Sequence, residues 1–332
     1  MSGPIIALDR ISKDFVTPLD LAARAANLLG ARLRESAIRA VDDVSFAVDE
    51  GEVVGLVGES GCGKSTLGRI VADVLAPSAG SVNFRGAPRD ELAGEAARTA
   101  ALKVQMIFQD PMASLNPRLR VGDIVGEAPV VHGIVTRAER RDYVAALLER
   151  VGLDPRYTTR YPHQFSGGQR ARIGIARALA VKPDFLVCDE SVAALDVSIQ
   201  AQILNLFMEL RHDLKLTYLF ISHDLGVVEH LSDRVVIMYL GRVVEIAPTE
   251  TLFRAANHPY TRALLANVPR LEARKQRFAP IAGEIPSPLD PPSGCQFHPR
   301  CPFAMARCKS EAPALREITP GHRSACHLND AA

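Results

Sequence analysis

The chain has 332 residues, 47% of them hydrophobic and 23% charged, which suffices for a full hydrophobic core with a small appendage. Lys and Arg number 39 against 38 for Asp and Glu, and the resulting net charge of +1 argues against a nucleic-acid surface. The most apolar segments fall short of the ~20 residues that a membrane-spanning helix needs, so the chain is not itself a membrane channel.

The amino-terminal sequence, MSGPIIALDR, has no charged start before an apolar run, so we expect no export signal. Residues 5–15 and 41–48 have the apolar patterns of strands, and the second segment alternates as an antiparallel strand does. Between them, residues 16–39 are helix-prone and basic, as in a surface insertion. An apolar run over 53–57 leads into a glycine-rich loop and a predicted helix over 64–75.

The predicted secondary structure changes twice in the middle of the chain. Strands are predicted over 81–85 and 103–108, with an Ala-rich helix over 90–102 between them. From about 110 to 180 the strand signal almost vanishes, which predicts a helical subdomain inserted in an α/β core. The alternation then returns, with strands predicted over 185–188 and 216–221, helices over 197–214 and 225–231, and a hairpin around Gly241.

Two short helices, predicted over 250–256 and 260–268, precede a segment of different composition. Its sequence IPSPLDPPSG, residues 285–294, holds prolines that continue neither a helix nor a central strand. A small cysteine-bearing tail follows.

The loop GESGCGKST, residues 58–66, fits the phosphate-loop template G-x-x-x-x-G-K-[ST]. Its glycines let the backbone take φ values that a side chain forbids, so successive N–H groups can point at phosphate oxygens. Lys64 begins the following helix and reaches the β- and γ-phosphates, while the Ser65 hydroxyl binds Mg²⁺. The predicted nucleotide-binding residues of this loop are Gly58, Ser60, Gly61, Gly63, Lys64, Ser65 and Thr66.

Two further segments offer groups to a nucleotide. Asp189 and Glu190 follow the apolar strand, so Asp189 is placed to hold Mg²⁺ and Glu190 to orient or deprotonate the water that attacks the γ-phosphate. The tetrapeptide SGGQ, residues 166–169, precedes a predicted helix whose first N–H groups are free for an anion. Alone this tetrapeptide is a weak signal, because SGG also occurs in flexible turns.

Together these motifs resemble those of the ATP-binding-cassette ATPases. GESGCGKST, Gln109 after a strand, FSGGQ, FLVCDE, ALD at 194–196 and the His223 of ISHD follow the order and approximate spacing of that family. The resemblance implies an α/β phosphate-loop core with an antiparallel β subdomain and the inserted helical subdomain. It also implies two such domains facing head to tail, with each ATP between one chain's phosphate loop and the other chain's SGGQ.

The resemblance also assigns roles to residues. The expected catalytic residues are Glu190, His223 and Gln109. The expected Mg²⁺ ligands are Ser65, Gln109 and Asp189. Further contacts to ATP are expected from Phe15, Ser166, Gly168, Gln169 and Asp196. In this scheme His223 hydrogen-bonds the γ-phosphate, Gln109 links metal and water to a mobile loop, and Phe15 stacks on adenine.

Two residues depart from the family pattern. Ser191 stands where the family often has Pro, and Ala193 where it often has Ser, so we expect the loop leading to Asp196 to differ in flexibility or in cross-interface hydrogen bonding. Glu190 is retained, and hydrolysis is therefore still expected.

The carboxy-terminal part of the sequence assigns the resemblance to a narrower group within this family. HPYTRALL at 258–265 and GEIPSPLDPPSGCQFHPRCP at 283–302 resemble the extension of ATPase subunits of bacterial oligopeptide, dipeptide and nickel importers, and QMIFQDPMASLNPR at 105–118 supports this. The resemblance implies a nucleotide-binding domain over 1–257 and a carboxy-terminal extension over 258–332. The likeness is closer to the second of the two paired subunits. It implies a heterodimer with a sister ATPase, two permease subunits, an extracytoplasmic substrate-binding protein, no nucleic acid, and a peripheral position on the cytoplasmic face of the inner membrane.

The tail carries four cysteines in the spacing C-x5-C-x6-C-x17-C, namely Cys295, Cys301, Cys308 and Cys326. Four thiolates suit a [4Fe–4S] cluster or a tetrahedral Zn²⁺. The spacing lacks the x2 knuckle of structural zinc sites, and related importer subunits carry an iron–sulfur cluster here, which favours iron. Zinc, with His298 or His322 as substitute ligands, and free or disulfide-linked thiols are the alternatives.

These features predict the ATPase subunit of a peptide-class importer, in which ATP closes the dimer and hydrolysis reopens it. The loop from 110 to about 125 is the expected seat for a cytoplasmic helix of the permease. The transport path lies in other chains, so nickel, glutathione or another small solute is an alternative cargo. A soluble cassette ATPase of translation or DNA repair, a regulatory module with impaired hydrolysis and an exporter half are rival functions.

Overall fold

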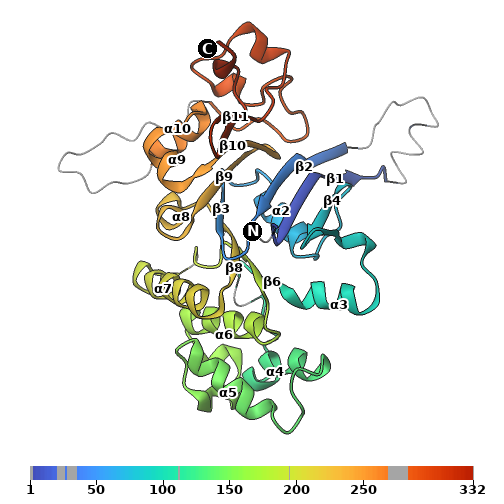
Figure 1. Ribbon diagram of the computed structural model, residues 1–332, viewed down its shortest axis with the longest axis vertical. Coiled ribbons are helices and arrows are strands. Elements are labelled where there is room, and N and C mark those ends of the chain that lie inside the picture. Colours follow the sequence, from blue (N-terminus) through green and yellow to red (C-terminus); the bar gives the residue numbers. More distant parts are fainter. Residues whose placement is uncertain are drawn as a thin grey trace, which may run out of the picture.

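Two β-sheets carry the fold (Figure 1). The computed structural model describes residues 3–20, 27, 36–110, 113–193, 195–267 and 283–331. The smaller sheet has the strand order β2-β1-β4-β5, and the larger has the order β11-β12-β10-β9-β3-β8-β7-β6. Much of the predicted insertion at 16–39 lies outside the described residues, as do 111–112, Ala194 and 268–282.

The smaller sheet is antiparallel, as the alternating sequence predicts. Strand β1 (Ile6–Thr17) pairs with β2 (Ser36–Val48) on one side and β4 (Ala79–Phe84) on the other, and β5 (Ala87–Pro88) completes the sheet. Phe15 of β1 faces Ile38 of β2 in the register. Strand β2 therefore begins five residues before the predicted position, inside the segment expected to be a helix-prone insertion.

The centre of the larger sheet is parallel. Its strands are β3 (Val53–Val57), β6 (Val104–Ile107), β7 (Phe185–Asp189) and β8 (Thr217–Ser222). Three of them, β3, β7 and β8, are buried at every residue, as expected for strands covered on both faces. Because parallel strands end at one edge, the segments after β3, β7 and β8 meet there.

Beside these strands the sheet turns antiparallel through a hairpin. Strand β9 (Arg234–Tyr239) runs parallel to β3 and returns through Gly241 into β10 (Arg242–Pro248). The helices around the sheet are α2 (Lys64–Val71), α3 (Gly94–Lys103), α7 (Val197–Leu214), α8 (Leu225–Leu231), α9 (Thr249–Ala255) and α10 (Pro259–Ala266).

A helical subdomain lies at one end of the larger sheet, below it in Figure 1. It contains α4 (Val121–Val131), α5 (Arg140–Arg150) and α6 (Gly167–Leu179), with 3₁₀ turns at Pro155–Thr159 and Pro162–Gln164. Its apolar side chains pack with those of α7 and of one face of the sheet in a single core, which includes Val125, Leu148, Ile175 and Phe207. This subdomain matches the predicted one at about 110–180.

The carboxy-terminal extension continues the main sheet. Strand β12 (His322–Ser324) pairs with β10, and β11 (Arg316–Thr319) forms the sheet edge; the sequence predicted neither strand. Short 3₁₀ turns lie at His298–Arg300, Ala306–Lys309 and His327–Ala331. Glu245 of β10, fully buried, lies 2.7 Å from Nε2 of His322 and accepts from the N–H of Asn257. Core and tail therefore share a sheet and a buried polar contact.

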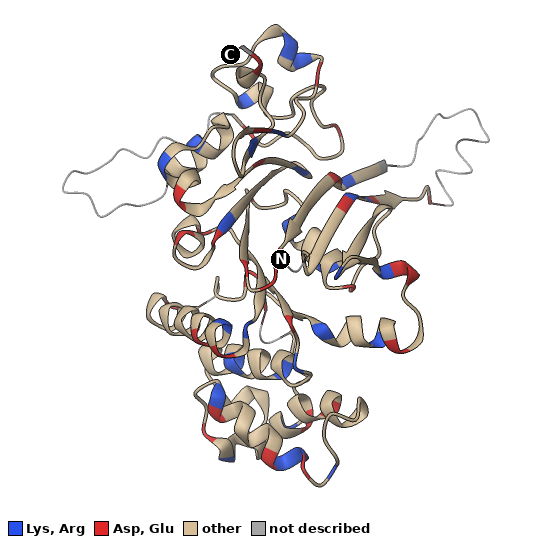
Figure 2. Cartoon of the chain, viewed as in Figure 1, with Lys and Arg blue, Asp and Glu red and all other residues tan. Residues whose placement is uncertain are grey.

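Positions of Lys and Arg and of Asp and Glu are spread over the core, the helical subdomain and the tail (Figure 2). Among the described helices, none combines the length and the apolar character needed to cross a membrane.

Candidate functional site

The phosphate loop connects β3 to α2. Lys64 is buried and its Nζ donates to the carbonyl oxygens of Gly58, at 2.8 Å, and Glu59, at 3.0 Å. Helix α2 begins at Lys64 with no side chain capping its first N–H groups, which leaves them available to an anion. The loop therefore brings the Lys64 ammonium and the uncapped start of α2 together.

Two glycines of this loop have no room for a side chain. A Cβ at Gly58 would lie 2.1 Å from the carbonyl oxygen of Met238, and one at Gly63 would lie 2.0 Å from that of Ala40. Gly63 also has a φ of +104°, which L side chains rarely adopt. Ser60 and Gly61 are exposed on the loop, and Thr66 is half-buried in the first turn of α2.

A pair of oxygen ligands lies beside the loop. Ser65 Oγ donates to Asp189 Oδ1 over 2.8 Å, and Asp189, at the end of β7, is 2% exposed. Burial raises the pKa of the Asp189 carboxyl, while the Ser65 hydroxyl bond opposes this rise. Hydroxyl and carboxylate oxygens are ligands that Mg²⁺ takes together with substrate phosphates, so these two residues fit the metal of a nucleotide complex.

The three predicted catalytic residues meet at one carboxylate. Gln109 Nε2 donates to Glu190 Oε2 over 2.6 Å, and His223 Nδ1 lies 3.2 Å from Glu190 Oε1. The Glu190 side chain is 15% exposed and its φ is +43°, while the His223 side chain is 57% exposed. A carboxylate held on both oxygens and facing an open edge is suited to orient a water molecule.

The SGGQ segment lies at the start of α6, in the helical subdomain. Ser166 caps α6, with its Oγ accepting from the N–H of Gln169 and its own N–H donating to Gln169 Oε1. A Cβ at Gly168 would lie 2.4 Å from Cγ2 of Ile199 in α7. In the described part of this single chain, these residues bond to one another and none of their hydrogen bonds reaches the phosphate loop.

Other predicted residues are exposed. Phe15 on β1 is 44% exposed, with Lys13 Nζ 5.6 Å from its ring centroid, and Asp196 is exposed immediately before α7. The Ser191 hydroxyl is buried, and it has no hydrogen-bond partner among the described residues. The exposed Phe15 ring leaves its face available to a base.

Sequence reasoning missed the residues that hold Glu59 of the phosphate loop. Arg300 and Tyr260, both from the carboxy-terminal extension, bond to its carboxylate and its backbone N–H. The letters HPYTRALL and HPRCP drew attention to both segments, but only as signs of family likeness.

The four tail cysteines are unpaired thiols. Backbone N–H groups of Phe297, Phe303 and Leu328 are directed at the sulfurs of Cys295, Cys301 and Cys326. Burial raises the pKa of Cys295 to about 11, and the other three thiols add to this rise. Within the described residues, however, no group of three or more His, Cys, Asp or Glu side chains is arranged to hold a metal ion, so the expected closed four-thiol site is not formed.

Comparisons of the sequence with known proteins identify its family. The family described as ABC transporter matches residues 41–193, and the family described as oligopeptide/dipeptide transporter, C-terminal region, matches residues 244–308. The chain is 51% identical to the putative oligopeptide transport ATP-binding protein YkfD of Bacillus subtilis, over 89% of this chain and 91% of that protein. A putative peptide import ATP-binding protein of Brucella ovis is 52% identical, over 88% and 93%.

Solved structures give the same answer for the fold. The ATP-binding cassette MJ0796, solved as a dimer in a post-hydrolysis state with ADP and Pi, is 27% identical with a TM-score of 0.62, over 74% of this chain and 98% of that one. CbiO1 of Clostridium perfringens is 25% identical with a TM-score of 0.61, over 76% and 91%. The chain therefore belongs to the ABC transporter ATPases and carries the carboxy-terminal region of the oligopeptide/dipeptide transporters.

Proposed function

We propose that this chain is the ATP-hydrolysing subunit of a peptide importer, acting with separate permease subunits. The observation that carries the proposal is the cluster of Gln109, Glu190 and His223 beside the Ser65–Asp189 pair. The names of the relatives, which refer to oligopeptide transport and peptide import, support peptides as the cargo. Nickel, glutathione or another small solute is the alternative cargo.

Hydrolysis follows from the positions of these side chains. Lys64 exchanges its bonds to the carbonyls of the loop for bonds to the β- and γ-phosphates, and the free N–H groups of α2 bind the same oxygens. Ser65 and Asp189 would hold Mg²⁺, which when bound would supply positive charge to the phosphates. Glu190 orients the attacking water and accepts its proton, while Gln109 and His223 fix the carboxylate.

The half-site is completed by a second cassette. Ser166 is exposed and Gln169 half-buried, and among the described residues their side chains bond to each other's backbone N–H, so we propose that they exchange these bonds for the γ-phosphate of an ATP bound to another chain. We propose that this second chain is a sister ATPase, because the sequence resembles one member of a pair. The structure of MJ0796 is a dimer of cassettes, which is consistent with two cassettes meeting in this way.

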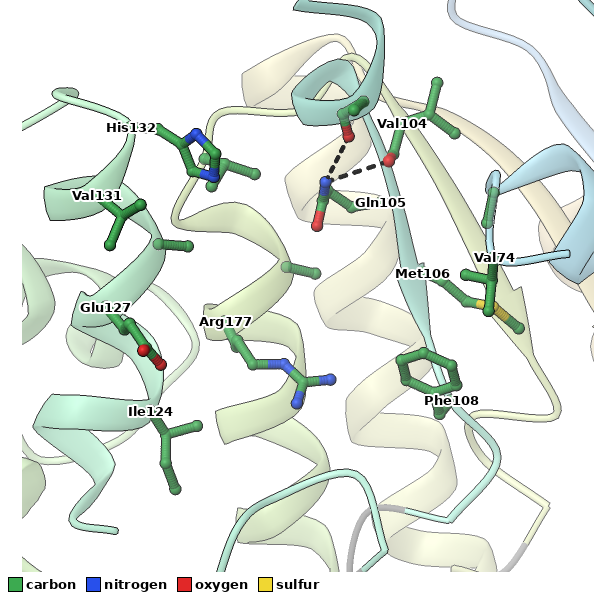
Figure 3. Close-up of a pocket in the computed structure, with 15 residues that line it drawn as sticks. Val74, Val104, Gln105, Met106, Phe108, Ile124, Glu127, Val131, His132 and Arg177 are labelled. Carbon is green, nitrogen blue, oxygen red and sulfur yellow. Dashed lines mark hydrogen bonds between the residues drawn. The ribbon is translucent and has the colours of Figure 1, made fainter. Parts of the chain in front are cut away.

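A hollow between the sheet and the helical subdomain is the proposed seat of the permease (Figure 3). It has a volume of about 590 Å³ and lies between α4, α6 and β6. Val131 and Val74 at its rim are 69% and 55% exposed, and Glu127 and Arg177 reach into it. Arg177 also donates to the carbonyl of Ser114, within the loop that follows Gln109. This contact ties the hollow to the segment that follows Gln109 in the sequence. The proposal places the chain peripherally at the cytoplasmic membrane face.

The test is co-purification of the tagged chain from its native membrane. We expect two multispanning permeases and a sister ATPase to be recovered, together with the substrate-binding protein when substrate is added. Recovery of ribosomal or DNA-repair proteins without a permease would overturn the transport function while leaving the ATP site intact.

A finer proposal concerns the four cysteines, for which we propose a [4Fe–4S] cluster, with Zn²⁺ as the alternative. Four free thiols and three N–H groups directed at sulfur support it chemically, although the thiols are not arranged here as a closed site. Anaerobic purification followed by an iron and zinc assay tests it. We expect about four irons per chain, and a chain with neither metal would refute the proposal.

A further inference from the structure

Glu59 is the second residue of the phosphate loop, and the carboxy-terminal extension holds it by two groups. Its backbone N–H donates to Tyr260 Oη over 2.9 Å. Its carboxylate accepts from both Nη atoms of Arg300, at 2.7 and 3.0 Å, in the two-pronged geometry that guanidinium and carboxylate groups favour. Lys64 binds the carbonyl of the same residue, so Glu59 is held from both sides of the loop.

Arg300 is itself held in place. Its side chain is 4% exposed, and its guanidinium lies 5.9 Å from the ring centroid of Tyr239, whose Oη is 3.5 Å from Nη1. Tyr239 in turn packs against Tyr260 and Phe297, and all three rings are almost fully buried. A buried guanidinium fixed by packing keeps its partner carboxylate in one position.

Because Glu59 is negatively charged, its contact with Arg300 affects the binding of an anionic nucleotide. A carboxylate in a loop that receives a triphosphate opposes anion binding unless a positive charge neutralises it. The Glu59 side chain is only 21% exposed, so solvent screens it weakly. Arg300 supplies the neutralising charge from a segment 241 residues away, on the turn His298–Arg300 that ends just before Cys301.

We propose that Arg300 is a positioning residue of the ATP site, through which the carboxy-terminal extension sets the affinity of the phosphate loop for nucleotide. The inference rests on ATP binding at this loop, as in the proposed function. Arg300 bonds to the Glu59 carboxylate, and within the part of the chain that the structure describes no hydrogen bond joins it to Gln109, Glu190 or His223. It therefore governs the binding of ATP and leaves the chemical step to Glu190.

The test compares ATP affinity, KM and kcat in the purified complex for four variants. Arg300→Met keeps the buried volume but leaves Glu59 uncompensated, so we expect ATP to bind about tenfold more weakly, with KM raised equally and kcat little changed. Arg300→Lys keeps the charge without the two-pronged bond and is expected to be intermediate. Glu59→Gln combined with Arg300→Met removes the uncompensated charge and is expected to restore most of the affinity.

Arg307→Met is the matched control, since Arg307 lies in the same extension but pairs with the exposed Glu311. Thermal unfolding of each variant reports whether the fold is kept, and Arg300→Lys carries the test if Arg300→Met does not fold. Wild-type affinity in Arg300→Met or, in that case, in Arg300→Lys would overturn the inference. So would a double variant as weak as Arg300→Met, because the loss would then come from packing alone. Wild-type protein that binds no ATP would overturn the proposed function itself, and this inference with it.

Discussion

Gly63 and Gly174 are opposite cases of the same residue type. Gly63 combines a φ of +104° with a backbone oxygen 2.0 Å from where a Cβ would lie. Gly174 lies inside α6, where a Cβ would meet nothing within 4 Å. Only the first position is fixed by the conformation that the phosphate loop requires.

We therefore expect Gly63→Ala to abolish ATP binding and to lower the free energy of unfolding by about 1–3 kcal/mol or more, because strain and overlap add. Gly174→Ala is expected to raise that free energy by up to about 1 kcal/mol, since Ala favours helix. Denaturant unfolding and titration with a fluorescent ATP analogue measure both effects. Wild-type nucleotide binding in Gly63→Ala would contradict the loop geometry described above.

In the proposed function, hydrolysis depends on Glu190. Gln has the same shape and can still bond to Gln109 and His223, but it cannot accept a proton. We expect Glu190→Gln to reduce ATP hydrolysis by roughly 10²–10⁴-fold while ATP affinity changes little. Glu229→Gln, at an exposed position of α8, is the control and should hydrolyse ATP normally. An active Glu190→Gln variant would move the catalytic role to another group.

Only the site residues that belong to local sequence motifs could be predicted from the sequence pattern itself. The phosphate loop and the Asp189–Glu190 pair follow from local pattern, because each stands directly after a buried strand. Gln109 and His223 lie 81 and 33 residues from Glu190 and were placed by family resemblance alone. The contact of Arg300 with Glu59 joins segments 241 residues apart, and no local pattern encodes it.

At the scale of elements, strong local signals gave accurate bounds. Helices α7 and α8 begin and end where predicted, and Asp224 caps α8 by accepting from the N–H groups of Gly226 and Val227. The helix expected over 90–102 is interrupted, because Leu92 is extended, with ψ 139°, between the turn Arg89–Glu91 and α3. Strands β11 and β12 were missed because they are short and depend on pairing with β10.

Helix α10 carries a buried histidine that should make stability depend on pH. His258 Nδ1 accepts from the N–H of Tyr260, and burial lowers the pKa of the ring to about 4 from the ordinary value of 6.5. Between these two values the unfolded chain binds a proton that the folded chain does not, so the free energy of unfolding falls as the pH falls. The loss between about pH 7 and pH 5 is about 2 kcal/mol.

Chemical denaturation at the two pH values measures this loss. His258→Asn keeps a side-chain acceptor at the start of α10 but does not titrate, so its stability should change less over the same interval. An equal change in both proteins would assign the pH dependence to other groups.

At the scale of the whole molecule, we expect the hollow between the larger sheet and the helical subdomain to transmit closure of the cassette dimer to the permease. Val131 is exposed at its rim, and a charge there opposes the burial of an apolar partner surface. We expect Val131→Glu to abolish stable association with the permeases while basal ATP binding by the free chain is unchanged. Leu328→Glu, at an exposed apolar position of the tail, is the control. Normal assembly of Val131→Glu would place the permease elsewhere.

The most direct measurement is ATP-dependent uptake of a labelled oligopeptide by vesicles that contain the complete complex. The account predicts accumulation that requires hydrolysable ATP, that disappears with Glu190→Gln in this chain, and that is accompanied by peptide-stimulated ATP hydrolysis. Uptake that continues with Glu190→Gln would show that this chain does not power transport. A complex that hydrolyses ATP but accumulates only a non-peptide solute would contradict the peptide cargo.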